Sequence, residues 1–142
     1  MHRTFSTRTR VRFAETDASG IVYYNNYFVY FEVGRIEMFR ELGLPYDWRI
    51  PIAETHCRFR ASARFDELLE VHSFVEEVRS KGFRIGHRVH RVDGPDEGLA
   101  LLAEGYTAMV HVGEDRRPRL LPTEFRAALD AALAGVDSSR IE

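Results

Sequence analysis

A single acidic residue, Asp17, stands directly before the most apolar segment of the chain. No charged residue occurs between Ala18 and Phe31, and the segment begins with the small residues Ala-Ser-Gly before it becomes rich in tyrosine and phenylalanine. A carboxylate can attack a carbonyl carbon or deprotonate a water molecule. An isolated aspartate before such a segment more often caps a turn or a helix. The structure that the following residues form therefore decides between these two interpretations.

The residues after Asp17 predict a long helix from about residue 25 to residue 42. Apolar positions recur at helical spacing: Tyr27, Phe31, Gly34, Met38 and Leu42. Gly43 supplies a C-terminal stop signal. A helix N-terminus leaves about four backbone N–H groups without partners and carries roughly half a positive charge. It can therefore stabilise negative charge that develops on a nearby carbonyl oxygen.

Alternating and β-branched segments predict a sheet that covers this helix. We expect strands over residues 4–13, 52–60, 68–78, 83–92 and 99–112, and a short helix over residues 123–135 that begins with Thr123 as its N-cap. Phe13 and Phe59 are predicted on the buried faces of the first two strands. One curved antiparallel sheet of about five strands, wrapped around one long helix, buries both patterns in an α+β fold. Where the alternation is blurred, we expect a second subunit to cover the sheet or its edge.

Composition limits the class of protein. The 142 residues fit one domain over 1–142, and the net charge of -2 gives no sign of nucleic-acid binding. No apolar run reaches the roughly 18 residues that a membrane-spanning helix needs, and the N-terminus has no signal-peptide pattern. The lone Cys57 excludes an internal disulfide and a zinc site of paired cysteines. These features predict a cytoplasmic protein that binds neither nucleic acid nor membrane.

The motif around Asp17 resembles a known family. The stretch from Arg12 to Glu32, R-F-A-E-T-D-A-S-G-I-V-Y-Y-N-N-Y-F-V-Y-F-E, is similar to the corresponding motif of hotdog-fold acyl-CoA thioesterases of the 4-hydroxybenzoyl-CoA thioesterase family. The stretch 63–71, A-R-F-D-E-L-L-E-V, resembles a second family segment, with Ser62 where a proline is common and Phe65 in place of a tyrosine. The resemblance implies a hotdog fold and hydrolysis of an aroyl- or fatty-acyl-CoA thioester to a free acid and coenzyme A. It implies no cofactor beyond the coenzyme A carried by the substrate.

The resemblance also implies roles for residues of the motif. Asp17 would be the catalytic carboxylate, as nucleophile or general base, and the backbone N–H near Tyr24 would bind the thioester carbonyl. Many bacterial relatives have a histidine at the position of Tyr24, so the Tyr-Tyr pair here favours a mechanism without histidine. Substrate-binding positions follow from the same motif: Gly20, Ile21, Tyr23 and Tyr27.

Residues outside the motif are candidates for contacts with coenzyme A and with other subunits. The arginines of the predicted strands, Arg84 and Arg88 among them, are interpreted first as a solvated face. The alternative is that cationic side chains hold the coenzyme A phosphates, and the candidates are Lys81, Arg84 and Arg88. Ser19 lacks the surroundings of a catalytic serine, and the histidines show no clustering typical of metal ligands. The resemblance further implies a homo-oligomer, built as a dimer of dimers. Three alternatives stay open: a thioesterase for acyl carrier protein, a non-catalytic acyl-CoA-binding or regulatory module, and a purely structural interaction domain.

Overall fold

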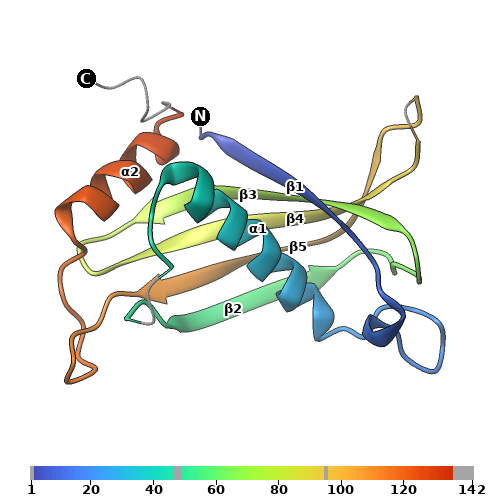
Figure 1. Ribbon diagram of the computed structural model, residues 1–142, viewed down its shortest axis with the longest axis horizontal. Helices are drawn as coiled ribbons and strands as arrows, with labels where there is room; N and C mark the ends of the chain where they lie inside the picture. The colour runs from blue at the N-terminus through green and yellow to red at the C-terminus, as the bar shows by residue number, and fades with distance from the viewer. Residues whose placement is uncertain (1, 47–48, 95, 136–142) are drawn as a thin grey trace.

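The computed structural model describes residues 2–46, 49–94 and 96–135, and these residues form one five-stranded antiparallel sheet and two α-helices (Figure 1). The strands lie in the order β1-β3-β4-β5-β2. Their bounds are β1 Thr4–Arg10, β2 Ile52–Phe59, β3 Leu68–Val78, β4 Gly82–Val92 and β5 Leu99–Val110. The helices are α1, Asn26–Leu42, and α2, Thr123–Leu133, and a short 3-10 helix η1 spans Phe13–Glu15. The predicted α+β architecture is confirmed.

The long helix α1 lies across one face of the sheet, as its apolar stripe predicts (Figure 1). Tyr27, Phe31 and Met38 from this stripe are almost completely buried. The helix ends at Gly43, which adopts the left-handed conformation with φ 70°. Both predicted limits of α1 therefore agree with the structure to within one residue.

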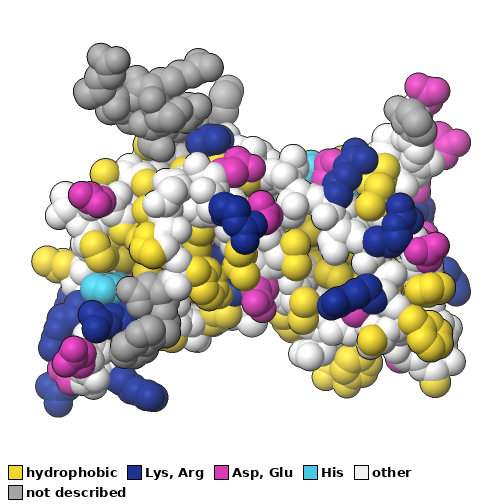
Figure 2. Space-filling view, viewed as in Figure 1, with side chains coloured by type: hydrophobic (Ala, Val, Ile, Leu, Met, Phe, Trp, Pro, Cys, Tyr) yellow, Lys and Arg dark blue, Asp and Glu magenta, His cyan; other side chains and the backbone are white. Residues whose placement is uncertain are grey.

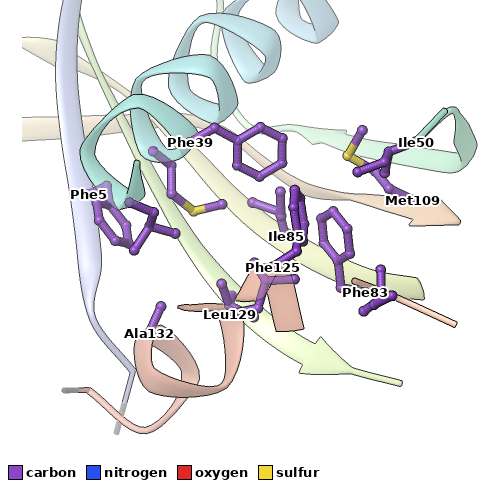
Figure 3. Packing of buried hydrophobic residues seen from close by; sticks show 13 residues of the cluster. Phe5, Phe39, Ile50, Phe83, Ile85, Met109, Phe125, Leu129 and Ala132 are labelled. Atoms are coloured by element: carbon purple, nitrogen blue, oxygen red, sulfur yellow. The ribbon is translucent and has the colours of Figure 1, made fainter. Parts of the chain in front are cut away.

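The buried residues form two clusters along α1. The first surrounds the C-terminal half of α1 and includes side chains from β4, β5 and α2, among them Phe83, Met109 and Leu129 (Figure 3). The second surrounds the N-terminal half and includes Tyr27, Tyr30 and Phe31 with apolar residues of β3, β4 and β5. The helix α2 covers the first cluster only, so the two ends of α1 have different surroundings.

Three local predictions are wrong. The first strand ends at Arg10, and Phe13 lies in η1 with 76% of its surface exposed, because the Arg12 backbone N–H turns to the Glu15 carboxylate instead of a strand partner. The strand β2 lies at the sheet edge, so Phe59 is 47% exposed within the chain. The helix α2 takes Pro122 as its N-cap, and Thr123 is its first residue.

Among the described residues, no helix has the length and apolarity that crossing a membrane requires.

Candidate active site

The loop that carries Asp17 is held in shape by its own backbone. The Asp17 N–H donates to the Ile21 carbonyl oxygen at 2.8 Å, and the Gly20 N–H donates to the Asp17 carbonyl oxygen at 3.0 Å. Gly20 has φ 80°, a conformation that costs a residue with a side chain about 1–2 kcal/mol. Isolated bridges pair Thr16 with Val22 across the loop and Ile21 with Arg64 in the segment between β2 and β3. These contacts explain the glycine in the motif.

The Asp17 carboxylate is oriented by one of its two oxygens. The Ser19 backbone N–H donates to Oδ1 at 2.8 Å, which is an Asx-turn. Oδ2 has no hydrogen-bond partner within residues 2–46, 49–94 and 96–135. The side chain is only partly buried. One oxygen thus fixes the carboxylate, and the other is free to act on a substrate or on water.

The chain enters α1 through Tyr23, Tyr24 and Asn25. The Tyr23 N–H donates to the Glu15 carbonyl oxygen at 2.9 Å, and Asn26 and Tyr27 donate to the carbonyls of Tyr23 and Tyr24 as the helix begins. In the part of the chain that the structure describes, the N–H of Tyr24 has no hydrogen-bond acceptor. An unused backbone donor at the positive end of a helix is suited to bind a carbonyl oxygen or an oxyanion.

A pocket of about 460 Å³ lies between this loop and the end of β2. Its lining residues are Asp17, Ile21, Val22, Tyr23, Tyr24, Tyr27, Phe59, Arg60, Ala61 and Ser62. The ring of Phe59 lies 5.2 Å from that of Tyr27 and 6.5 Å from that of Tyr24, measured between centroids. Hydrophobic side chains reach the surface at this end of the molecule, at the lower right of Figure 2. The pocket therefore combines one carboxylate with aromatic walls.

Two tyrosines that line the pocket, Tyr27 and Tyr23, have raised pKa values. Burial raises the pKa of Tyr27, whose oxygen accepts the Ala63 backbone N–H at 3.1 Å. Contact with the Tyr24 side chain raises the pKa of Tyr23. Tyr27 is 2% exposed and is mainly a wall, whereas Tyr23 and Tyr24 are 46% and 57% exposed. Tyr23 and Tyr24 are thus the tyrosines with surface available to a ligand.

The structure brings together most residues that the motif predicts for the site. Asp17, Ile21, Tyr23, Tyr24 and Tyr27 line one pocket. Gly20 lies on the same loop and shapes it without lining the pocket.

The predicted coenzyme A contacts lie elsewhere in the chain. Lys81 and Arg84 line a separate pocket of about 390 Å³ at the β3–β4 turn. Arg88 lies on the outer face of the sheet, over the ring of Phe74. Neither pocket shares a lining residue with the other, so a single chain does not join these cations to Asp17. Their coenzyme A role stays a prediction.

The sequence does not predict Val22, the β2 end of the pocket or Glu15 as parts of this site. Phe59 is predicted on a buried strand face, but it lines the pocket, followed by Arg60, Ala61 and Ser62, because β2 is an edge strand. Glu15, two residues before Asp17, is a buried carboxylate at the base of the loop. A glutamate inside the E-T-D segment was the only available signal. Among the described residues, no cluster of histidine, cysteine and acidic side chains could hold a metal ion.

Comparisons with known proteins show the family of this chain. A family model described as the thioesterase-like superfamily matches residues 11–133. A putative acyl-CoA thioesterase of Bacillus subtilis is 30% identical over 124 residues, covering 83% of this chain and 84% of the relative. The 4-hydroxybenzoyl-CoA thioesterase of Pseudomonas sp. strain CBS-3 is 27% identical over 137 residues, covering 88% of this chain and 96% of the relative.

A solved structure extends the similarity to three dimensions. It is a 4-hydroxybenzoyl-CoA thioesterase with an aspartate-to-asparagine substitution, in complex with 4-hydroxybenzoyl-CoA. It has a TM-score of 0.79 and 25% identity, and the match covers 89% of this chain and 99% of that chain. The family match spans most of the chain, and the sheet and long helix agree with hotdog-fold thioesterases. This chain therefore belongs to the thioesterase-like superfamily.

Proposed function

We propose that this protein hydrolyses acyl-CoA thioesters to a free acid and coenzyme A, with Asp17 as the catalytic carboxylate and the Tyr24 backbone N–H as the oxyanion donor. One observation carries the proposal: the free Oδ2 of Asp17 and the unused N–H at the start of α1 belong to residues that line the same pocket. The names of the relatives, which include acyl-CoA and 4-hydroxybenzoyl-CoA thioesterases, support the reaction class.

The reaction needs one carboxylate and one oxyanion donor. The thioester carbonyl oxygen would accept the Tyr24 N–H, and negative charge would grow on that oxygen as the carbonyl carbon is attacked. In one route Asp17 takes a proton from the water that attacks. In the other, Oδ2 attacks, the carbon–sulfur bond breaks to release coenzyme A, and water then hydrolyses the resulting anhydride. Both routes give the same acid and thiol.

The first experiment measures thiol release from a panel of aromatic and aliphatic acyl-CoAs with wild type and Asp17→Asn. Asparagine can still accept the Ser19 N–H, so the loop keeps its shape while the reactive oxygen is lost. We expect kcat to fall about 10²–10⁴-fold, the range for loss of a positioned acid–base group. The control is Asp115→Asn, because Asp115 also accepts a backbone N–H two residues on, from Arg117, but outside the pocket.

Three outcomes oppose the proposal. If the wild type hydrolyses no acyl-CoA of the panel, the proposed activity is wrong. If it binds acyl-CoA tightly without turnover, the protein is a binding module. If kcat is unchanged in Asp17→Asn, Asp17 is not the catalytic carboxylate. Faster turnover of the same acyl groups on acyl carrier protein would change the substrate carrier but keep the roles of the residues.

Only the nucleophilic route can place a solvent oxygen on Asp17 during a single turnover. With excess enzyme in ¹⁸O-labelled water, Asp17 gains ¹⁸O when water attacks the anhydride at the Asp17 carbonyl, whereas attack at the acyl carbonyl, or a general base, leaves Asp17 unlabelled. Peptide mass spectrometry of the Asp17 segment measures the label. Labelled Asp17 assigns the nucleophilic route.

The proposal includes a homo-oligomer that forms through β2, which is an exposed edge strand. Two copies paired antiparallel about His56 place Glu54 of each strand opposite Arg58 of the second copy, so the charges are complementary. In the same pairing, the start of β2 in one copy lies beside the end of β2 in the other. It brings the Lys81 and Arg84 pocket of one copy, which Glu54 also lines, toward Phe59 and the Asp17 pocket of the other.

Sedimentation equilibrium tests this pairing. Glu54→Arg is expected to weaken the dimer, and adding Arg58→Glu is expected to restore it. An unchanged oligomeric state in Glu54→Arg would contradict the β2 interface. The dimer of dimers and the cytoplasmic location stay predictions.

A further inference from the structure

Glu15 is a buried acid that the proposed reaction does not use. It is 7% exposed and lies two residues before Asp17, at the end of η1. Both carboxylate oxygens are occupied. Oε1 accepts the Arg12 backbone N–H at 2.9 Å and the Tyr30 hydroxyl at 3.0 Å, and Oε2 accepts Nε and Nη2 of the Arg12 side chain at 3.2 and 3.0 Å. These four hydrogen bonds give both oxygens the polar partners that a buried carboxylate requires.

The backbone of Glu15 makes a second set of contacts with the start of α1. Its carbonyl oxygen accepts the Tyr23 backbone N–H at 2.9 Å and the Asn26 side-chain Nδ2 at 2.9 Å. Tyr23 lines the Asp17 pocket, and Asn26 is the first residue of α1. One residue therefore connects the chain just before Asp17 to the helix end that carries the Tyr24 N–H.

The contact with Tyr30 extends this connection into the core. Tyr30 lies on α1, is 1% exposed and packs in the cluster around the N-terminal half of the helix. Burial, and secondarily the Glu15 carboxylate, raises the pKa of Tyr30, so the hydroxyl stays protonated and donates to Oε1. The position of Glu15 is thus tied to a residue that cannot move without disturbing the core.

We propose that Glu15 is a positioning residue: it holds the Asp17 loop against the first turn of α1, so that the Asp17 carboxylate and the Tyr24 N–H address the same thioester. This inference rests on the proposed function. Glu15 does not line the pocket and so does not act on the substrate directly. Displacement of a reacting group by about 1 Å costs up to 10²-fold in rate, so loosening this anchor reduces turnover more than binding.

The test compares Glu15→Gln and Tyr30→Phe with wild type. Glutamine keeps the size of the side chain but removes its charge, and phenylalanine removes only the hydroxyl that donates to Oε1. We expect kcat to fall about 10- to 100-fold in Glu15→Gln and less in Tyr30→Phe, with KM nearly unchanged. If Glu15→Gln does not fold, Tyr30→Phe still gives the result, because its ring keeps the core filled.

Glu70→Gln is the matched control for loss of an ion-paired carboxylate. Glu70 on β3 accepts Arg8 Nε at 3.0 Å and lies 2.7 Å from His72 Nε2, and it does not line the Asp17 pocket. We expect Glu70→Gln to lower the melting temperature without lowering kcat. If Glu15→Gln folds and its kcat stays within twofold of wild type, the proposal is overturned.

A double-mutant cycle separates positioning from an independent role. If Glu15 acts through Asp17, the Glu15→Gln change is expected to have little further effect on kcat in the Asp17→Asn background. A loss of the same factor in both backgrounds would show that Glu15 acts independently of Asp17 and would overturn the proposal.

Hydrogen exchange provides a readout that does not need the activity. The Asp17 N–H donates to Ile21 and the Tyr23 N–H donates to Glu15, so both amides report on the anchor. We expect exchange at both to speed up about fivefold or more in Tyr30→Phe, a factor typical of one lost hydrogen bond, while amides in the middle of β4 do not change. Unchanged exchange at Asp17 and Tyr23 in Tyr30→Phe overturns the anchor even if no acyl-CoA is hydrolysed. Faster exchange in Tyr30→Phe together with a wild type that hydrolyses no acyl-CoA contradicts only the proposed function.

Discussion

The two halves of α1 are held by different interactions: apolar packing around the C-terminal half, and packing with hydrogen-bonded tyrosines around the N-terminal half. The C-terminal half buries Met38, Phe39 and Leu42 in an apolar cluster that α2 closes with Phe125 and Leu129 (Figure 3). The N-terminal half buries Tyr27 and Tyr30, and both hydroxyls are used. The Tyr27 oxygen accepts the Ala63 N–H, and the Tyr30 hydroxyl donates to Glu15.

This difference separates stability from the positioning of the site. Apolar contacts contribute free energy in proportion to buried area but hardly specify the direction of a neighbouring group. Hydrogen bonds have preferred distances and angles, so they fix the loop that approaches the helix N-terminus. The C-terminal half of α1 should therefore matter for unfolding, and the N-terminal half should matter for turnover.

The largest effect on folding should come from Leu129→Ala. Leu129 is fully buried in the cluster around the C-terminal half of α1. Removal of a buried leucine side chain destabilises a protein by about 2–5 kcal/mol, because apolar contact is lost and a cavity remains. We expect this loss in urea unfolding, with kcat per folded molecule unchanged. A fall in kcat comparable to that of Glu15→Gln would contradict the division between the halves.

The pH dependence of stability should arise from His87, which lies beneath the N-terminal half of α1. His87 on β4 is stacked on Phe31 of α1, between Ser73 Oγ at 3.0 Å and Thr107 Oγ1 at 3.2 Å. Burial, and secondarily the Arg35 charge, lowers the pKa of His87 to about 3. The unfolded chain therefore takes up this proton first as pH falls below about 6.5. Stability should fall from pH 6.5 toward pH 3, by up to about 1.4 kcal/mol per pH unit.

Unfolding free energies at pH 7, 5.5 and 4.5 measure this slope, with His87→Gln as the comparison because glutamine does not titrate. Carboxylates contribute to the slope of both proteins, so the difference between the slopes isolates His87. Equal slopes in wild type and His87→Gln would contradict the prediction.

The smallest effect on folding should come from Gly20→Ala, with Gly98→Ala as its control. Both glycines have a positive φ, 80° and 77°, and an added Cβ would have no neighbour within 4 Å at either position. Each substitution should cost about 1–2 kcal/mol of stability from backbone strain. Because Gly20 shapes the Asp17 loop, we expect kcat to fall about tenfold in Gly20→Ala only. Equal kcat values for the two variants would show that the loop shape does not control the reaction.

Much of the local structure follows from the residues themselves. The spacing of Tyr27, Phe31 and Met38 predicts α1, and Gly43 predicts its end, because side-chain periodicity and the left-handed preference of glycine act over a few residues. The strands β3, β4 and β5 are predicted for the same reason. The motif around Asp17 gives the candidate carboxylate, and its neighbours in sequence, Ile21 and Tyr24, line the same pocket.

Other features depend on how these elements pack. The strand order makes β2 an edge, so Phe59 lines a pocket instead of the core. The same packing separates Lys81 and Arg84 from Asp17 within one chain. Alternation along a strand shows which residues share a face, but it cannot show which strands lie beside it.

Local spacing and residue type are enough to predict the long helix, the strands that cover it and the acid placed before the helix N-terminus. The contact of Glu15 with Tyr30, fifteen residues further along the chain, and the end of the Asp17 pocket at β2 depend on tertiary packing. Such contacts arise when α1 packs on the sheet, and the free energy of that packing belongs to the whole set of buried residues and to no single segment.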